Sequence, residues 1–597
     1  MEMEDQKRFV TAMILSSVIL FAYFILYAGP QQKQLAEQQQ QAQLLEQQQQ
    51  IQSTVSTTPE PILPKGVDIT IETPTLSGSF STVGTNFNNL QLKKFNKTIK
   101  KGSPVVTLLE PIGSETPAYI FDGWSNEIGE TGEFIEWNLE SGSRLTENTP
   151  VTLTYDAGDY TVKRIVSIDD KYLITLTDTL TNTSDSLINV VRKGASRQHG
   201  LPEGLRNFPF ILHEGTVGSI DNHLIDMNYG KIAKKGNVSH QGESGWVGLT
   251  DQYWLSAAIA PQGQQMTANY AMNLRDNQDV YEAAYELAPM QVSAGTSIES
   301  VGYIFAGPKI HEVLKTYTDM GISRMDLAVD YGRLGLLTKP MTWGLTKLGN
   351  MTGNFGVGIL ILTLIIKIIL FPLNNKSYSS MAKMKAVGPK VEKMKQRYGD
   401  DRMKLQQEML ALYKKEGVNP AAGCLPMIPQ MFVFFALYKS LFITLEMRHA
   451  PFVGWIKDLS AKDPLSILNG FGLFPWDAVP IGILSFLAIG PLALMYGISM
   501  AMTQTLNQMP ADKMQARMFQ FMPLIFMFVL APFAAGLLVY WVWSNILTFL
   551  QQYIITRKYG VETPLDRFFN KLFGRPNKEA TNPDVEIIPP EKPAKKK

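Results

Sequence analysis

The sequence predicts a multi-domain membrane protein with six transmembrane α-helices, an antiparallel β-sandwich outside the membrane and a helical hairpin on its inner side. Three observations predict this fold class. Apolar runs crowd residues 8–28 and 355–555, whereas residues 60–320 have the composition of a soluble domain. Within 67–305, apolar and polar residues alternate as in half-buried strands. Two charged, helix-favouring segments lie between the second and third apolar runs.

The first run, residues 9–28, follows Lys7 and Arg8. Its apolar core is too long for a cleaved signal peptide and Pro30 is a poor cleavage context, so we expect an uncleaved anchor. The remaining spans are expected within the later apolar runs. The expected parts are an anchor (1–30), a glutamine-rich linker (31–59), the sandwich (60–320), an interfacial amphipathic helix (321–350), the second span (351–376), the hairpin (377–418), the third span (419–445), an outer loop (446–480), the fourth span (481–504), an inner loop (505–517), a hairpin of the fifth and sixth spans (518–555) and a basic tail (556–597).

The distribution of lysine and arginine orients these spans, because cytoplasmic loops carry an excess of both. Residues 376–415 contain eleven of them, whereas residues 446–480 contain three. The tail ends in Lys595, Lys596 and Lys597. We therefore expect both termini in the cytoplasm and the sandwich outside.

Composition excludes several kinds of site. A formal net charge of +1 over 597 residues argues against a dedicated nucleic-acid-binding protein. The single cysteine, Cys424, allows no intrachain disulfide and no cysteine-based metal cage. The sandwich region has no phosphate loop, nucleophile elbow or zinc spacing, and its adjacent His213 and Glu214 are interpreted as structural. We expect no enzyme activity, cofactor or metal.

Lys367 is the most informative residue, because it lies within the apolar run 355–373. A cation there costs at least ~2.5 kcal/mol. At ~1.5 Å per residue it would lie ~9 Å from the cytoplasmic end of a continuous helix. Thr363 precedes it by one turn, Gln430 lies early in the third span and Ser544 late in the sixth. These depths predict polar groups in the inner half of the membrane and nearly pure hydrocarbon in the outer half.

Two interpretations of this pattern remain open. Lys367 can extend its ammonium to the inner headgroups while the amides cap helix ends. Alternatively, the polar residues converge on a wet cavity that opens to the cytoplasm and is closed to the outside. A fifth span of 15 residues (518–532), with Pro523 inside it, favours the second interpretation, because a short span thins the bilayer locally.

Several long segments resemble one known family. They are FPLNNKSYSSMAKMKAVGPK (371–390), QEMLALYKKEGVNPAAGCLPMIPQM (407–431), RHAPFVGWIKDLSAKDP (448–464) and SNILTFLQQ (544–552). In order and spacing they are similar to the YidC membrane protein insertases of Gram-negative bacteria. The resemblance covers the layout of the whole chain and is strongest over 354–552.

The resemblance implies a protein of the bacterial inner membrane with a periplasmic β-super-sandwich, a five-helix insertase core behind an N-terminal anchor, and a hydrophilic groove open to the cytoplasm. It implies an insertase and chaperone for nascent membrane proteins, acting alone or with the Sec translocon. The hairpin would recruit substrate; with the basic tail it is a candidate contact for the ribosome or the lipid bilayer.

Residue by residue, the resemblance implies a groove lined by Lys367, Thr363, Gln430 and Ser544. Substrate would leave beside four further residues: Met431, Phe435, Tyr540 and Trp541. One position departs from the family, which normally has an arginine where this chain has Lys367. The charge is kept, but the bidentate fork is lost.

Two other classes of protein are alternatives to an insertase. A secondary transporter would use Lys367 to bind an anionic solute, but the internal repeats and paired broken helices typical of transporters are not visible in the sequence. An envelope scaffold would use the sandwich to bind glycan.

Overall fold

The computed structural model describes residues 66–126, 133–202, 205, 212–275, 278–398, 401–417, 425–474, 489–507, 513–559, 563 and 565–566. The expected anchor (1–30), the linker (31–59), the start of the expected fourth span and most of the basic tail lie outside the described residues. Lys65–Lys597 forms one compact unit, so contacts between its sheets and helices are described below.

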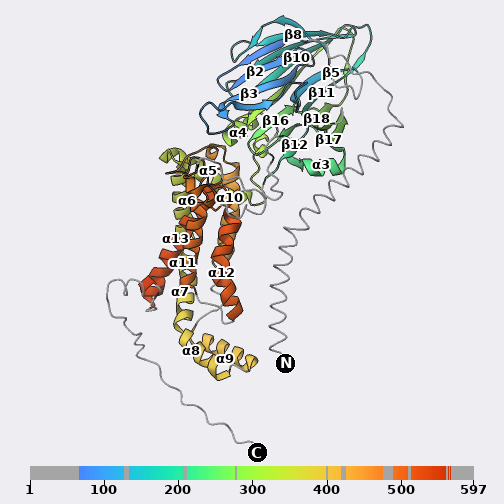
Figure 1. The fold of residues 1–597 in the computed structure, drawn as a ribbon. Helices are drawn as coiled ribbons and strands as arrows, with labels where there is room; N and C mark the ends of the chain where they lie inside the picture. The colour runs from blue at the N-terminus through green and yellow to red at the C-terminus, as the bar shows by residue number, and fades with distance from the viewer. Residues whose placement is uncertain are drawn as a thin grey trace, which may run out of the picture. The chain divides into compact units, whose positions relative to one another are not determined.

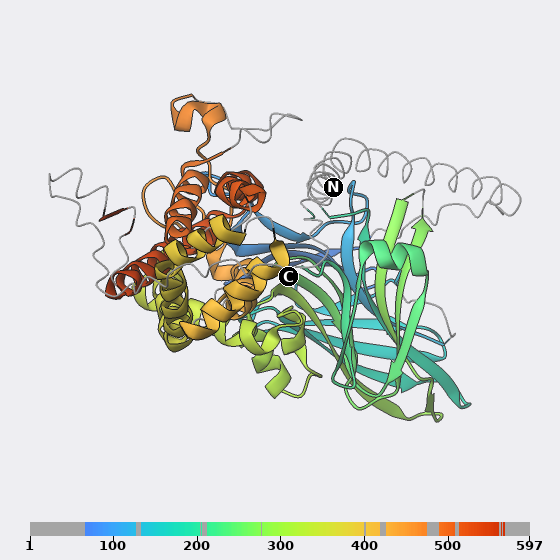
Figure 2. The same cartoon turned by 90° about the horizontal axis from the view of Figure 1, so that it is seen from below.

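The strands of the predicted sandwich form two large, curved sheets (Figures 1 and 2). In the 11-stranded sheet the order is β14-β17-β18-β11-β5-β3-β2-β1-β7, with β19 on β11 and β4 on β3, and in the 9-stranded sheet it is β13-β12-β15-β16-β20-β10-β9-β8-β6. The strands are β1 (Asp68–Glu72), β2 (Leu76–Ser81), β3 (Asn86–Asn96), β4 (Val105–Leu109), β5 (Ala118–Ser125), β6 (Asn138–Ser141), β7 (Arg144–Leu145), β8 (Val151–Asp156), β9 (Tyr160–Ile168), β10 (Leu173–Asn182), β11 (Ile188–His199), β12 (Gly215–Ile220), β13 (His223–Asn228), β14 (Val238–Gly242), β15 (Gly245–Thr250), β16 (Trp254–Ile259), β17 (Met266–Arg275), β18 (Gln278–Leu287), β19 (Met290–Val292) and β20 (Ser297–Pro308).

Alternation of side chains determines which face of each strand is buried. In β9, Val162 and Val166 are buried between outward-facing neighbours. The same inward row contains Arg164, which is also fully buried. Successive side chains of a strand point to opposite faces, so the period-2 pattern seen in the sequence produces this core. The predicted sandwich is confirmed.

The core also holds a set of four buried charges. Arg164 donates from Nε to Asp178 Oδ1 at 2.7 Å and from Nη2 to Asp122 Oδ1 at 2.6 Å. Arg192 donates from Nε to Asp122 Oδ1 at 3.0 Å. Trp124 donates from its indole nitrogen to Asp178 Oδ2 at 2.7 Å. Two arginines therefore neutralise two aspartates, as a dry interior requires.

Helices follow the sheets along the chain. They are α3 (Tyr229–Lys235), α4 (His311–Asp319), η2 (Met325–Ala328), α5 (Gly335–Thr352), α6 (Phe355–Ile369), α7 (Phe371–Ala386), α8 (Gly388–Tyr398), α9 (Arg402–Lys415), α10 (Met427–Ile443), η4 (Leu445–Met447), η5 (Ile467–Gly472), α11 (Pro491–Leu506), α12 (Lys513–Leu530) and α13 (Ala535–Lys558). Helices α5, α6, α10, α11 and α13, which are labelled in Figure 1, contribute to one apolar core, which also includes Leu530 at the end of α12.

The expected continuous helix over 355–373 is wrong. Helix α6 ends at Ile369 and α7 begins at Phe371, with a 68° bend between them. The cause is Pro372, which lies in the first turn of α7. Proline has no N–H to donate to the preceding turn and its ring collides with the carbonyl four residues earlier, but it is tolerated where a new helix starts.

Only the bent pair α6–α7 is, by length and hydropathy, long and apolar enough to cross a membrane; no single described helix is. Shorter apolar helices are present at Ile428–Ile443 and Ala516–Leu530. Helix α12 starts five residues earlier than the predicted fifth span, at Lys513, and contains Pro523 in its interior. The number of spans therefore stays a prediction.

Helices α8 and α9 pack on each other through a small apolar cluster of Val387, Val391 and Tyr413. Asp401 caps α9, because its side chain accepts a hydrogen bond from the backbone N–H of Lys404 at 3.0 Å. Residues 377–386, which were predicted to start the hairpin, belong instead to α7.

Candidate functional site

Lys367 lies in the last turn of α6. Its ammonium Nζ donates to Thr548 Oγ1 at 2.9 Å and to Gln430 Oε1 at 3.3 Å. The carboxyl end of a helix carries a partial negative charge, which stabilises a cation in its last turn. Both hydrogen-bond partners are neutral, and among the described residues no carboxylate forms an ion pair with Lys367. The ammonium is thus held in place without being neutralised.

Gln430 links Lys367 to a third helix. Its amide Nε2 donates to the Tyr540 hydroxyl at 2.8 Å, while its Oε1 accepts from Lys367. Tyr540 is only 1% exposed. The hydrogen bonds therefore form a chain from Thr548 through Lys367 and Gln430 to Tyr540, which joins α6, α10 and α13.

Thr363 and Ser544 are both buried, but in the described part of the chain the ammonium bonds to Gln430 and Thr548 and not to them. The Thr363 hydroxyl donates to the carbonyl of Ile359, within its own helix, at 2.7 Å. The Ser544 carbonyl accepts from the Thr548 hydroxyl at 2.8 Å. Thr548 is the direct partner that the sequence-based site omitted. It follows Ser544 by four residues and so shares its helix face, which was a usable signal.

A second row of polar contacts joins α11 to α13. The Asn545 side chain donates to Ser499 Oγ at 3.1 Å. The Thr503 hydroxyl donates to the carbonyl of Asn545 at 3.4 Å. Gln552 donates to the Asn507 side chain at 3.1 Å. These polar residues lie on the same half of α13 as Thr548, so the polar side chains are concentrated in one part of the bundle.

The four predicted exit residues divide into two groups. Met431 and Phe435 are 57% and 49% exposed and lie one turn apart on α10, so they form an apolar strip. Trp541 is partly buried and stacks on Phe434 with ring centroids 5.2 Å apart. Tyr540 does not join the strip, because its hydroxyl belongs to the polar chain.

The expectation that the outer half of the helices is nearly pure hydrocarbon is wrong at Lys439. This second cation lies in α10, near the end opposite Gln430, and is 8% exposed. It forms an ion pair with Asp330. The two lysines therefore differ in kind: Lys439 is neutralised by a carboxylate and Lys367 has neutral partners.

Among the residues that the structure describes, no group of three or more His, Cys, Asp or Glu side chains is arranged to hold a metal ion. The polar chain around Lys367 consists of an ammonium, an amide and two hydroxyls, none of which is a ligand set for a metal.

Comparison with known proteins decides the family. A family model described as "YidC periplasmic domain" matches residues 68–344, and one described as "60Kd inner membrane protein" matches residues 347–562. The chain belongs to the YidC family of membrane protein insertases. The two matches together cover the sheets and the helical region, so YidC membership applies to both parts of an inner-membrane protein with a periplasmic domain.

Relatives agree over nearly the full length. The membrane protein insertase YidC of Maricaulis maris is 43% identical, over 96% of this chain and 99% of its own. That of Nitrobacter hamburgensis is 40% identical, over 96% and 98%. A crystal structure of an active YidC insertase covers 81% of this chain and 92% of its own, at 17% identity and a TM-score of 0.34. The comparisons give no support to a secondary transporter.

Proposed function

We propose that this chain inserts membrane proteins through a groove lined by Lys367, Thr363, Gln430 and Ser544. One observation carries the proposal: the Lys367 ammonium of α6 is held by hydrogen bonds to α10 and α13, and both of these partners are neutral. A partly buried cation without a carboxylate retains a positive field. It can therefore attract an acidic or polar segment of a substrate into the groove.

The apolar strip of Met431 and Phe435 supplies the other half of the mechanism. A substrate helix that moves along these exposed side chains into lipid gains ~25 cal/mol per Å² of apolar surface removed from water. This transfer supplies the driving force, so no nucleotide or cofactor is required. Snorkelling of Lys367 alone would not require the side chains of Gln430 and Thr548 to converge on its ammonium.

We further propose the topology that the loop charges predict. Six spans place both termini and the α8–α9 hairpin in the cytoplasm, and the sheets in the periplasm. The bent pair α6–α7 is consistent with a chain that leaves the membrane near Leu370 and continues as cytoplasmic helix. Nascent membrane proteins and the lipid bilayer are the proposed partners, together with the Sec translocon.

The hairpin is a proposed contact for the ribosome as well as for substrates. Lys390, Lys393 and Arg397 on α8, with Lys414 and Lys415 at the end of α9, make it strongly basic. Basic segments bind phosphate-rich surfaces without sequence specificity. No specific nucleic-acid recognition is proposed.

Photocrosslinking tests the function. A photoreactive amino acid at Met431 or Phe435 should crosslink a ribosome-tethered nascent chain that carries one transmembrane segment. The matched control is Leu274, which is 44% exposed on the sheet domain and should give no such product. Equal crosslinking from all three positions, or none from α10, would contradict the groove.

A further inference from the structure

The outer end of α10 is fixed by contacts on the side away from the groove. Lys439 forms an ion pair with Asp330, which lies in the segment that connects η2 to α5. Gly332 lies against the lysine stem, since a Cβ at that position would be 3.5 Å from Lys439 Cε. The stem and the charge of Lys439 are therefore both held by residues 330–332.

Asp330 is itself fixed to the sheet domain. Its Oδ2 accepts from the backbone N–H of His213 at 3.2 Å, and its Oδ1 accepts from that of Gly332 at 2.9 Å. Burial acts to raise the pKa of Asp330, but the Lys439 ammonium and the Gly332 N–H outweigh it and hold the pKa below its usual value. The carboxylate is thus ionised and immobile.

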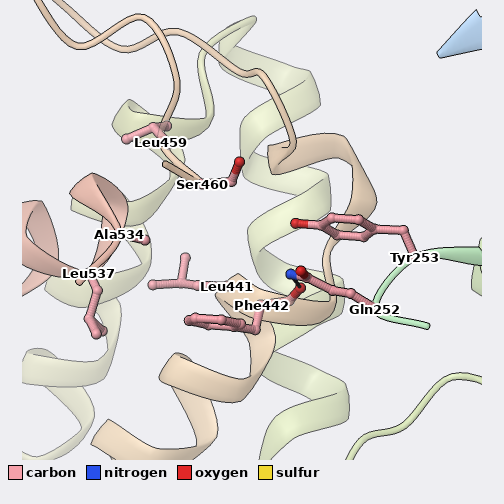
Figure 3. Close-up of a pocket in the computed structure, with 8 residues that line it drawn as sticks. All are labelled: Gln252, Tyr253, Leu441, Phe442, Leu459, Ser460, Ala534 and Leu537. Atoms are coloured by element: carbon pink, nitrogen blue, oxygen red, sulfur yellow. Dashed lines mark hydrogen bonds between the residues drawn. The ribbon is translucent and has the colours of Figure 1, made fainter. Parts of the chain in front are cut away.

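Two neutral hydrogen-bond contacts also hold this end of α10. Gln252, between β15 and β16, donates from Nε2 to the carbonyl of Phe442 at 2.8 Å (Figure 3). That carbonyl belongs to the last turn of α10, where carbonyls lack partners within the helix. Two residues earlier, the Ser440 hydroxyl lies 3.2 Å from the carbonyl of Thr338, in α5, and 2.9 Å from that of Ala436, in its own helix, so its one proton is shared between the two.

These contacts lie on the side of α10 opposite the groove, and that position matters for the groove. Gln430 and Lys439 are nine residues apart, which is about two and a half turns, so they lie on opposite sides of the helix and ~13 Å apart along its axis. A rotation of ~20° about that axis would move a side chain at ~5–6 Å radius by ~2 Å. Such a shift would break the 3.3 Å contact between Gln430 and Lys367.

We propose that the Asp330–Lys439 ion pair is a positioning site, through which the sheet domain sets the rotation of α10 and hence the geometry of the groove. Asp330 and Lys439 do not touch substrate; they act through α10 on Gln430, Met431 and Phe435. The role of the groove in insertion rests on the proposed function, but the rotation of α10 can be measured without any substrate.

Spin-label distances in the full chain test the proposal. After Cys424→Ser, labels are placed at Met431 on α10 and Ile546 on α13, both exposed, and the distance between them is measured in nanodiscs. Lys439→Arg should keep the wild-type distance. Lys439→Met should shift or broaden it and, in unlabelled protein, lower the insertion rate by about tenfold, a factor typical of coupling between two sites.

Lys439→Met leaves the buried Asp330 carboxylate without its charged partner and can prevent folding, so the double variant Asp330→Asn/Lys439→Met is the deciding test. It removes both charges, and we expect a broadened distance with a normal unfolding temperature. A wild-type distance in this variant would overturn the proposal. Lys367→Ala should lower insertion without changing the distance, so loss of the positioning role and loss of the proposed function give different results.

Discussion

Replacing Lys367 with alanine removes the one cation in the polar chain and leaves Gln430 and Thr548 without their shared donor. A substrate carboxylate at ~4 Å from the ammonium would gain ~1 kcal/mol in a water-like medium and ~4 kcal/mol at the effective dielectric of a protein surface. The partly buried groove lies between these limits. Lys367→Ala should therefore slow insertion of an acidic N-tail by about 5- to 1,000-fold.

The assay compares two versions of one single-span client in proteoliposomes, one with aspartate in its N-tail and one with asparagine. Protease protection of the tail reports insertion. Lys367→Arg should preserve both rates, and Lys367→Glu should abolish insertion of the acidic tail because it reverses the field. Lys457→Ala, which removes an exposed charge, is the matched control. If Lys367→Ala inserts both tails at the wild-type rate, electrostatic capture is refuted.

Three further predictions concern stability. Arg164→Met leaves Asp122 and Asp178 with one arginine, so the free energy of unfolding should fall by ~3–5 kcal/mol, measured by denaturant titration against exposed Lys163→Met. Burial lowers the pKa of Lys309 to about 8, below its ordinary value of 10.5. Between these two values the unfolded chain binds more protons than the folded chain, so stability increases as the pH rises. Thermal melts should therefore show the wild type gaining stability relative to Lys309→Met from pH 8 to 10.5. Gly356→Ala should lower the melting temperature, since its Cβ would lie 2.0 Å from a ring carbon of Phe452.

Local patterns made most of the sheet domain predictable. The alternation in β9 follows from the pleat alone, so Val162 and Val166 could be placed in the core from sequence. The partners of Arg164 could not, because Asp122 is 42 residues away along the chain and reaches it only through strand pairing. Which residues neutralise a buried charge depends on the pairing of distant strands, and a single sequence does not reveal that pairing.

The helical region shows the same limit. The sequence placed Lys367 and Gln430 in the same half of the helices, because helix rise and loop charge are both local. That their side chains meet was only one of two open interpretations, and their hydrogen bond was not predicted. The break at Leu370 was missed because the apolar run outweighed Pro372, although the proline was visible. Lys439 was visible in the third apolar run, and the expectation of a hydrocarbon outer half overlooked it. Its ion pair could not be predicted, because Asp330 lies 109 residues earlier and outside that run.

Access of water to position 367 tests the central claim most directly. A cysteine replaces Lys367 in a Cys424→Ser background, and membrane-impermeant maleimide is added to either side of oriented vesicles. A groove that opens only inward predicts labelling from the cytoplasmic side alone. Labelling from the periplasmic side, or protection from both sides, would contradict a hydrated pocket at this lysine.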